Sequence, residues 1–406
     1  MKSIVHKPFN IPARLYYGLL AAAGAVAGIG LLAAWYMEHN GHWVTGMDNQ
    51  IVWGMPHVFA IFLIVAASGA LNVASLSSVF GRMPYKPLAR LSGLLAAALL
   101  VGGLAVLVLD LGRPDRLIVA MTTYNFKSIF AWNIFLYTGF LAVVGVYLWT
   151  MMERRMNGFS GIAGMVAFIW RLGLTTGTGL IFGFLVAREA YDAAVMAPLF
   201  IAMSLAFGLA VFLPVLNGIQ RARCQELGDF LVRRMGRLLG IFVAAVLYFT
   251  AVQHLTNLYA AEHHGVERFI LMDGGIITLL FWGGQVLLGG VLPLFLLFGD
   301  KAGPQFNRVM AACGLIIVGG FAQVYVIVIG GQAYPLALFP GMEESSSFFD
   351  GRVHSYAPSL PEIALGLGGF GIAALVTLVG TRALPFLPAN LTDAAVDPHH
   401  GSEVGS

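Results

Sequence analysis

The sequence predicts an all-α integral membrane protein with about ten transmembrane helices. Only 11% of its 406 residues are charged and 58% are hydrophobic, whereas a soluble domain carries roughly 25% charged residues. Ten apolar stretches are long enough to cross a bilayer, which takes about 20 residues in a helix. Strand-like alternation between turn signals is absent, which argues against a membrane β-barrel.

The ten predicted spans place residues 1–381 in one polytopic membrane domain and leave residues 382–406 as a flexible cytoplasmic tail. Helices two to five and six to nine are expected to form two four-helix bundles, flanked by helices one and ten. Two longer connections are expected at 37–52 and 332–358. The predicted spans are 14–36, 53–79, 88–111, 128–152, 160–184, 192–218, 236–260, 272–298, 307–331 and 359–381.

The basic residues predict the orientation of the protein. If the N-terminus is inside, 16 of the 23 Lys and Arg residues fall in inner segments and 6 in outer ones. Cytoplasmic loops of membrane proteins carry such an excess of Lys and Arg. Both termini are therefore expected in the cytoplasm.

Polar residues gather at one end of three successive spans, between Gly46 and Tyr137. Polar and charged groups in membrane segments are costly and often mark a functional site. We interpret this end, which faces outside in the predicted orientation, as a surface pocket that binds a quinone. The residues are Asp48, Asn49, His57, Asp110, Arg113, Asp115, Arg116, Asn125, Lys127, Ser128 and Asn133.

His57 and Asp110 are the candidate proton-handling residues of this pocket. His57 lies about one turn into the second span, and a histidine pKa of about 6.5 suits proton exchange with a quinone oxygen. Asp110 ends the third span, where a buried carboxylate should be paired or have a raised pKa. Arg113, three residues on, can be the partner. The alternatives are a polar helix start for His57 and a simple ion pair at a helix end for Asp110.

Tyr124, Asn125, Ser128 and Trp132 enter the fourth span at the same depth and complete the predicted quinone pocket. Ser128 and Trp132 are four residues apart and so share one helix face. Aromatic walls and a few polar groups are what a quinone ring and its oxygens require. Taken singly, Tyr124 and Trp132 also fit the aromatic belt of a membrane interface.

Arg171 lies near the middle of the fifth span, where an arginine must face the protein interior. Thr175 lies about one turn away, and Glu189 follows at the outer end of this span. These three residues form the predicted proton path from the pocket. The alternatives are a structural arginine bonded to helix carbonyls and an exposed loop charge at Glu189.

The sequence offers no ligand set for a metal cluster. Cys224 and Cys313 are far apart, whereas iron–sulfur clusters and structural zinc need several ligands at close spacing. His57 and His254 are the one histidine pair within spans, and a b-type haem between them is a reading that the sequence does not favour. Electrons handled at the pocket are therefore expected to leave to a partner.

Three motifs resemble the NrfD/PsrC-like family, the membrane subunits of polysulfide-reductase-type complexes. They are WGMPH at the start of the second span, LDLGRPDR at the end of the third, and NFKS followed by Trp132. Within the family, GMDNQIVWGMPHVFAIFLIVAASGALNVAS and VLDLGRPDRLIVAM are most similar to the branch of the P subunit of the Dsr transmembrane complex of sulfur metabolism.

This resemblance implies a membrane anchor of an oxidoreductase complex in the bacterial inner membrane, without a bound metal of its own. It would exchange electrons between menaquinone or ubiquinone and a ferredoxin-like iron–sulfur subunit docked on the periplasmic side. Other membrane, cytochrome and iron–sulfur subunits of a Dsr-type complex would be partners, and nucleic acid would not. The resemblance implies a quinone pocket at His57, Asp110, Arg113, Asn125, Ser128 and Trp132, together with Tyr124.

A secondary transporter or proton-conducting protein is the alternative function. Ten helices, the mid-membrane Arg171 and the glycines at 173, 177 and 179 fit a transporter loosely. Against it, the polar groups cluster at one membrane surface, whereas transporters bind their substrates near the midplane. Redox-driven proton movement through Arg171 would combine the two functions.

Overall fold

The computed structural model describes residues 5–299, 303, 305–336 and 351–397. It confirms the predicted fold class, because ten helices in these ranges are long and apolar enough to cross a membrane. The unbroken ones are α1 (Ala13–Asn40), α2 (Met55–Ser78), α3 (Ala89–Leu109), α5 (Ile129–Met152), α6 (Ser160–Gly183), α7 (Met196–Ala222), α8 (Asp229–Tyr259) and α14 (Leu360–Ala383).

The eighth and ninth spans are composite helices. The eighth runs through α10 (Ile276–Leu279), the π-helical η7 (Leu280–Val291) and α11 (Leu292–Phe298). The ninth runs through α12 (Phe306–Tyr325), the π-helical η8 (Val326–Gly330) and α13 (Gly331–Ala333). Hydropathy predicts the length of these spans but not their change of helical pitch.

Short elements lie in the connections between the spans, before the first span and after the last. They are β1 (His6–Lys7), η1 (His42–Val44), η2 (Met83–Leu88), η3 (Pro114–Arg116), α4 (Leu117–Thr122), η4 (Asn157–Phe159), η5 (Ala261–His263), α9 (His264–Arg268), the π-helical η6 (Phe269–Asp273), β2 (Leu387–Pro388) and α15 (Asp393–Val396).

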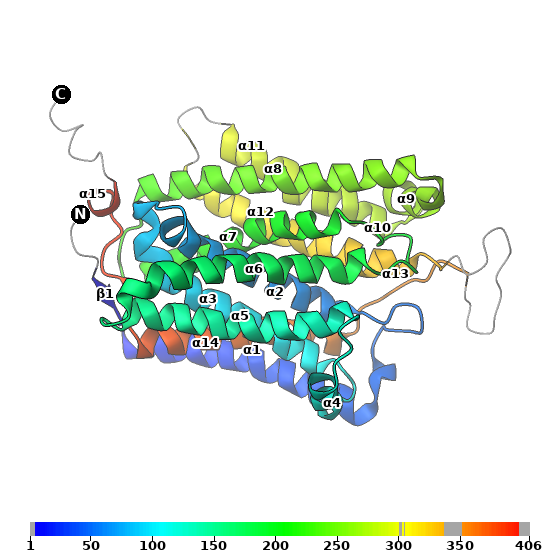
Figure 1. Cartoon of the computed structure of the whole chain (residues 1–406), viewed down its shortest axis with the longest axis horizontal. Helices are drawn as coiled ribbons and strands as arrows, with labels where there is room; N and C mark the ends of the chain where they lie inside the picture. The colour runs from blue at the N-terminus through cyan, green and yellow to red at the C-terminus, as the bar shows by residue number, and fades with distance from the viewer. Residues whose placement is uncertain (1–4, 300–302, 304, 337–350, 398–406) are drawn as a thin grey trace.

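The long helices form the two predicted bundles (Figure 1). α2, α3, α5 and α6 pack together as the first bundle, and α7, α8, α12 and the η7–α11 segment form the second. α7 packs on α2 and α6 and so joins the two bundles. α1 and α14 pack side by side, and α14 packs against α3, as the flanking helices one and ten of the prediction.

α2 is the central helix, and its most apolar 18-residue window is completely buried within the protein. It approaches α7 so closely that a Cβ atom at Gly69 would clash with the carbonyl oxygen of Ser204. Small residues permit such close helix packing in membranes. Any side chain at the end of α2 is therefore placed by a rigid helix that is packed on all sides.

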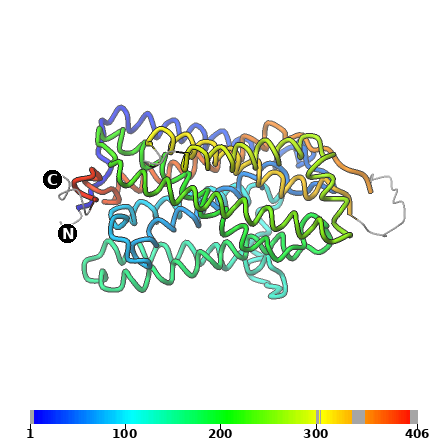
Figure 2. Tube along the Cα trace, turned by 90° about the horizontal axis from the view of Figure 1, so that it is seen from above, coloured from blue at the N-terminus to red at the C-terminus, as the bar shows by residue number. Residues whose placement is uncertain are grey.

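Both termini lie at one end of the bundles, and we call the opposite end the distal end (Figure 2). β1 pairs antiparallel with β2 at the terminal end, and Leu387 and Leu391 are fully buried there. The prediction of a flexible tail is therefore wrong for this stretch, because its apolar side chains dock on the helix ends. The tail beyond residue 397 and part of the predicted connection 332–358, residues 337–350, lie outside the described residues.

Candidate functional site

The distal ends of α2 and α3 bring His57 and Asp110 together. Pro56 occupies the first turn of α2, where a missing N–H costs no helical hydrogen bond, and His57 follows it. Asp110 directly follows α3, and Gly112 then turns the backbone with a φ of +68°, a conformation that glycine adopts without strain. The distance from His57 Nδ1 to Asp110 Oδ2 is 2.9 Å.

The pair is largely buried and incompletely bonded. The Asp110 side chain is completely buried, and 19% of the His57 side chain is exposed. Despite the short distance, the angles are not those of a hydrogen bond, and within the described ranges neither Asp110 oxygen nor His57 Nδ1 has a hydrogen-bond partner. Because buried polar atoms in native proteins are rarely left without a partner, this pair has unused capacity to bind a proton or a ligand oxygen.

The expected partnership of Arg113 with Asp110 is wrong. Arg113 Nε and Nη2 instead donate to Asp115 Oδ1 and Oδ2, each at 3.1 Å. Both side chains are more than 60% exposed, and each shifts the pKa of the other, that of Arg113 upward and that of Asp115 downward. The turn at Gly112 carries Arg113 out of the helix end, so histidine rather than arginine faces the buried carboxylate.

Aromatic rings cover His57 on the side of the first bundle. The indole of Trp53 stacks on the imidazole, with ring centroids 6.1 Å apart and an interplanar angle of 24°. Trp53 also makes edge contacts with Phe130 at the start of α5 and with Phe182 near the end of α6. Trp53 is not among the residues predicted for the pocket, although it lies four residues before His57 in the WGMPH motif.

Gln332 holds the backbone on which Trp53 sits. Its Oε1 accepts hydrogen bonds of 3.0 Å from the backbone N–H groups of Val52 and Trp53. Its Nε2 donates to the carbonyl oxygens of Trp53 at 3.0 Å and Val328 at 2.8 Å. Gln332 is only 2% exposed and follows η8, so the second bundle positions the aromatic wall of a site in the first. A lone glutamine in an apolar segment is the one sequence signal for this role.

Two further residues fasten the same loop. Arg188 donates from Nη1 to the carbonyl oxygen of Gln332 and from Nη2 to that of Gln50, both at 2.8 Å. Asp48 accepts from the backbone N–H groups of Gln50 and Ile51 and lies 2.8 Å from His354 Nδ1. Burial opposes ionisation of Asp48, but these bonds together lower its pKa. Asp48 thus shapes the loop that carries Trp53.

The four predicted residues around the start of α5 differ in their exposure and in their contacts. Ser128 is the half-buried residue before α5. Trp132 is 50% exposed, and its Nε1 donates to the carbonyl oxygen of Phe126. Asn125 is exposed and accepts from the backbone N–H of Lys127, and Tyr124 packs on Phe135 with ring centroids 4.4 Å apart. The bonds and ring contacts of these residues thus hold the start of α5 to the connection that precedes it.

Arg171 joins α6 to α2 inside the first bundle. It is 2% exposed, its Nη2 donates to Asn72 Oδ1 at 2.8 Å, and its guanidinium lies over the Phe168 ring. Thr175 donates to the Arg171 carbonyl oxygen at 2.9 Å. Arg171 Nε and Nη1 have no hydrogen-bond partner among the described residues. The arginine therefore bonds an asparagine side chain and not the helix carbonyls of the structural alternative.

Glu189 lies in the connection between α6 and α7 and is partly buried. Burial raises its pKa, and His263 and Glu262 are the charged groups that act on it. Both belong to η5 beside the second bundle. The structure thus associates Glu189 with the second bundle and not with the contacts of Arg171.

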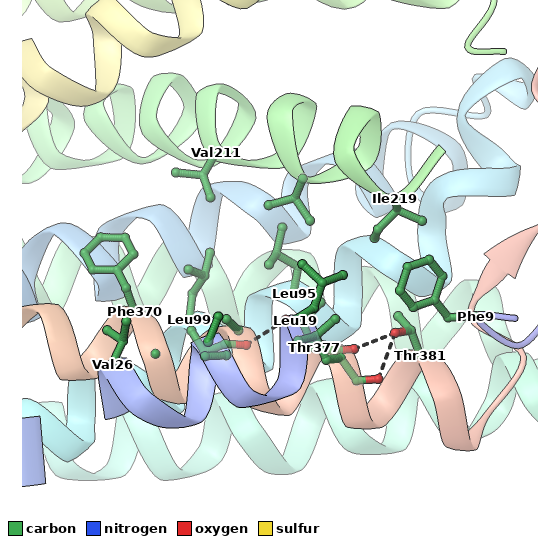
Figure 3. Close-up of a pocket in the computed structure, with 17 residues that line it drawn as sticks. Phe9, Leu19, Val26, Leu95, Leu99, Val211, Ile219, Phe370, Thr377 and Thr381 are labelled. Carbon is green, nitrogen blue, oxygen red and sulfur yellow. Dashed lines mark hydrogen bonds between the residues drawn. The ribbon is translucent and has the colours of Figure 1, made fainter. Parts of the chain in front are cut away.

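An apolar groove extends from the terminal end toward the middle of the long helices (Figure 3). It has a volume of about 500 Å³ and is lined by α1, α3, α7 and α14, including Val26, Leu99 and Phe370. Its hydroxyl groups, Thr377 and Thr381, donate to carbonyl oxygens of their own helix. The apolar surface of the groove suits lipid acyl chains, but the groove lacks an acid–base pair like the one at the distal end.

The two histidines within membrane spans face different carboxylates. His57 faces Asp110 in the first bundle, and His254 Nδ1 lies 2.7 Å from Glu267 Oε2 in the second. In the part of the protein that the structure describes, no group of three or more His, Cys, Asp and Glu side chains could hold a metal ion.

Comparison with known proteins identifies the family. Residues 43–336 match the family described as "Polysulphide reductase, NrfD". The protein is 27% identical to the Hdr-like menaquinol oxidoreductase integral membrane subunit of Archaeoglobus fulgidus, over 94% of its own length and 96% of the relative. It is 22% identical to the menaquinone reductase integral membrane subunit of Nitratidesulfovibrio vulgaris, over 89% of each of the two proteins.

A shorter relative matches part of the sequence. The protein NrfD of Escherichia coli is 25% identical over 70% of the present sequence and 96% of its own. The family match covers most of the sequence and includes the loop of Trp53, the His57–Asp110 pair, both bundles and Gln332. The protein therefore belongs to the NrfD family of polysulphide reductase and is a multi-pass integral membrane protein.

Proposed function

We propose that the protein is the quinol-reactive membrane subunit of a multi-subunit oxidoreductase complex. The observation that carries the proposal is the buried Asp110 carboxylate beside His57, under the indole of Trp53. An acid–base pair with an adjoining flat aromatic surface at a membrane boundary is what a quinol headgroup needs. The isoprenoid tail would remain in the apolar region of the bilayer.

The geometry supports different roles for His57 and Asp110 in quinol oxidation. Oxidation of a quinol to a quinone releases two protons and two electrons. Because Nδ1 of His57 faces Asp110, Nε2 is left to accept a proton from a quinol hydroxyl, and Asp110 stabilises the imidazolium that forms. The electrons leave to a redox partner at the distal surface, and the protons leave by way of His57 and Asp110.

The named relatives support a membrane quinol as the substrate. Two of them are called a menaquinol oxidoreductase subunit and a menaquinone reductase subunit. We propose menaquinol or ubiquinol for this protein, in the bacterial inner membrane with both termini cytoplasmic and the distal end periplasmic. A ferredoxin-like iron–sulfur subunit would bind there, together with cytochrome and other subunits of a Dsr-type complex of sulfur metabolism.

We propose that the remaining predicted residues form the rim of the pocket, the approach to it and a proton path leading from it. Arg113, Asn125 and Trp132 are exposed in the isolated subunit, and we propose that they form the rim that a partner subunit closes. Tyr124 and Ser128 would line the approach to His57. Arg171 with Thr175 would carry protons inward from the pocket, and Glu189 would exchange protons at the distal surface.

Binding of a fluorescent quinol analogue to the purified full-length protein tests the proposal. We expect saturable quenching with the wild type and an affinity lowered about 10-fold by His57→Leu, which corresponds to about 1.4 kcal/mol. His39→Leu is the matched control, because His39 is an exposed histidine that stacks on Trp35 at the end of α1. It should bind the analogue like the wild type.

One result would count against this function, and a second would count against the site proposed for it. If neither the wild-type protein nor its complete complex quenches the analogue, the quinol function is wrong, and substrate flux in proteoliposomes without redox partners becomes the test of the transporter alternative. If His57→Leu and wild type bind equally, the quinol lies elsewhere on the protein.

A further inference from the structure

The second bundle contains a buried acid–base pair of its own. Glu267 of α9 is completely buried, and its Oε2 lies 2.7 Å from His254 Nδ1 of α8. Its Oε1 accepts a hydrogen bond of 2.9 Å from Asn257 Nδ2. Each bundle thus holds one histidine near the distal end of a long helix, facing a buried carboxylate from a neighbouring element.

A small polar cavity adjoins this pair. It has a volume of about 20 Å³, which is room for one water molecule. His254 lines it together with Thr250, Gln285 and Gln323. The Nε2 atoms of both glutamines donate to Thr250 Oγ1 at 3.4 Å.

The polar lining continues away from the distal end. Gln285 and Gln323 also line a second cavity of about 10 Å³, whose α7 residues are Ala206 and Phe207. The first cavity instead meets α7 closer to its distal start, at 196 and 199. Gln285 and Gln323 therefore line both cavities, and polar side chains extend from His254 toward the interior of the bundle.

Irregular backbone surrounds the first cavity. All three π-helical segments of the described residues contribute to its lining, Ile270 from η6, Gln285 from η7 and Val326 from η8. π-Helical turns are uncommon and occur frequently at functional sites, because they redirect side chains from the regular helix spacing. Three of them around one polar cavity indicate that this cavity has a function.

The charge of Glu267 depends on His254. A carboxylate removed from water is costly when ionised unless a positive charge faces it, and the residue that faces Glu267 at ion-pair distance is His254. Neighbouring charges are engaged elsewhere: Arg268 pairs with Asp273 at 2.6 Å, and Glu262 lies 3.7 Å from His263. The imidazole and the carboxylate together offer positions for two exchangeable protons: with one proton the pair is neutral overall, and with two it is cationic.

We propose that Glu267 and His254 form a second proton-binding site, separate from the pair at His57. The site takes up and releases one proton at the distal end of the second bundle. Cavity water and the side chains of Thr250, Gln285 and Gln323 pass that proton to and from the bundle interior. No electron and no other group is transferred, and the site does not depend on a quinol at His57.

Infrared difference spectra of the full-length protein between acidic and alkaline pH test the proposal. Protonation of a buried carboxylate creates a carboxylic-acid carbonyl band that shifts in D₂O. We expect one such band in wild type to disappear in Glu267→Gln, to persist at a changed frequency in Glu267→Asp, and to titrate at a different pH in His254→Gln. Asp110→Asn is the control and should retain the Glu267 band.

Each outcome decides the proposal. A spectrum of Glu267→Gln that keeps every carboxyl band of the wild type, or a Glu267→Asp band that does not move, overturns it. Titration dependent on sodium rather than pH would also overturn it. If Glu267→Gln does not fold, the Glu267→Asp and His254→Gln spectra decide. Quinol-analogue binding should be the same in wild type and Glu267→Gln, so failure of the quinol function leaves this test intact.

Discussion

Asp110→Asn is expected to lower the rate of quinol oxidation by the complete complex about 100-fold or more, within the range of effects of a positioned acid–base group. Asparagine keeps the size of the buried side chain but removes the charge that faces His57 Nδ1 at 2.9 Å. The imidazolium formed when His57 accepts a proton then lacks its counter-ion. Steady-state quinol oxidation with an artificial electron acceptor measures this rate.

Asp229→Asn is the matched control for that experiment. Asp229 begins α8 at the terminal end, and its carboxylate is 62% exposed and lies 3.8 Å from the Arg233 guanidinium. Exposed ion pairs contribute about 0–1 kcal/mol, so this variant should turn over quinol at nearly the wild-type rate. Equal losses in the two variants would point to a general loss of stability, and full activity of Asp110→Asn would remove Asp110 from the mechanism.

Gln332→Leu is expected to weaken quinol binding about 10-fold and to raise KM more than it lowers kcat. Leucine has similar volume but leaves the partly buried N–H groups of Val52 and Trp53 without the partner that now holds them at 3.0 Å. Each buried group left unpaired costs about 1–3 kcal/mol. The loop is then free to shift the Trp53 indole from the face of His57, and KM and kcat of the complete complex report the effect.

Two further variants separate positioning from general destabilisation. Gln220→Leu removes another buried glutamine, 1% exposed, at the terminal end of α7, and should leave KM unchanged. Gln332→Glu keeps an oxygen for the N–H groups of Val52 and Trp53 and should recover part of the affinity. If Gln220→Leu raises KM as much as Gln332→Leu, the effect is a general loss of stability and not the position of Trp53.

Hydropathy predicts the framework of this protein well. Each long helix must satisfy its backbone groups internally in lipid, so span number and approximate bounds follow from local composition. The convergence of His57 and Asp110 also follows, because neighbouring antiparallel helices bring the start of one beside the end of the next. The partner of Asp110 does not follow, because the turn at Gly112 decides whether Arg113 or His57 faces the carboxylate.

Most of the features that could not be predicted from the sequence depend on contacts between residues that are far apart along it. Gln332 lies 279 residues after Trp53 in the sequence and contacts it from another helix. No local sequence pattern predicts such a pair. Glu267 is buried although it belongs to a short polar connection between two spans. The expectation of a flexible tail is wrong for residues 382–397 for the same reason, because the docking of Leu387 depends on its pairing with β1.

Photo-crosslinking with a quinone that carries the reactive group on its ring tests the central claim most directly. After illumination of the full-length protein in lipid, peptides are mapped by mass spectrometry, with excess unlabelled quinol as competitor. We predict competed labelling at the distal end, in peptides that contain Trp53–His57 and Ser128–Trp132. Competed labelling confined to the apolar groove, near its terminal end at Phe9, Ile219 or Thr381, would contradict the assignment of the quinol site to His57 and Asp110.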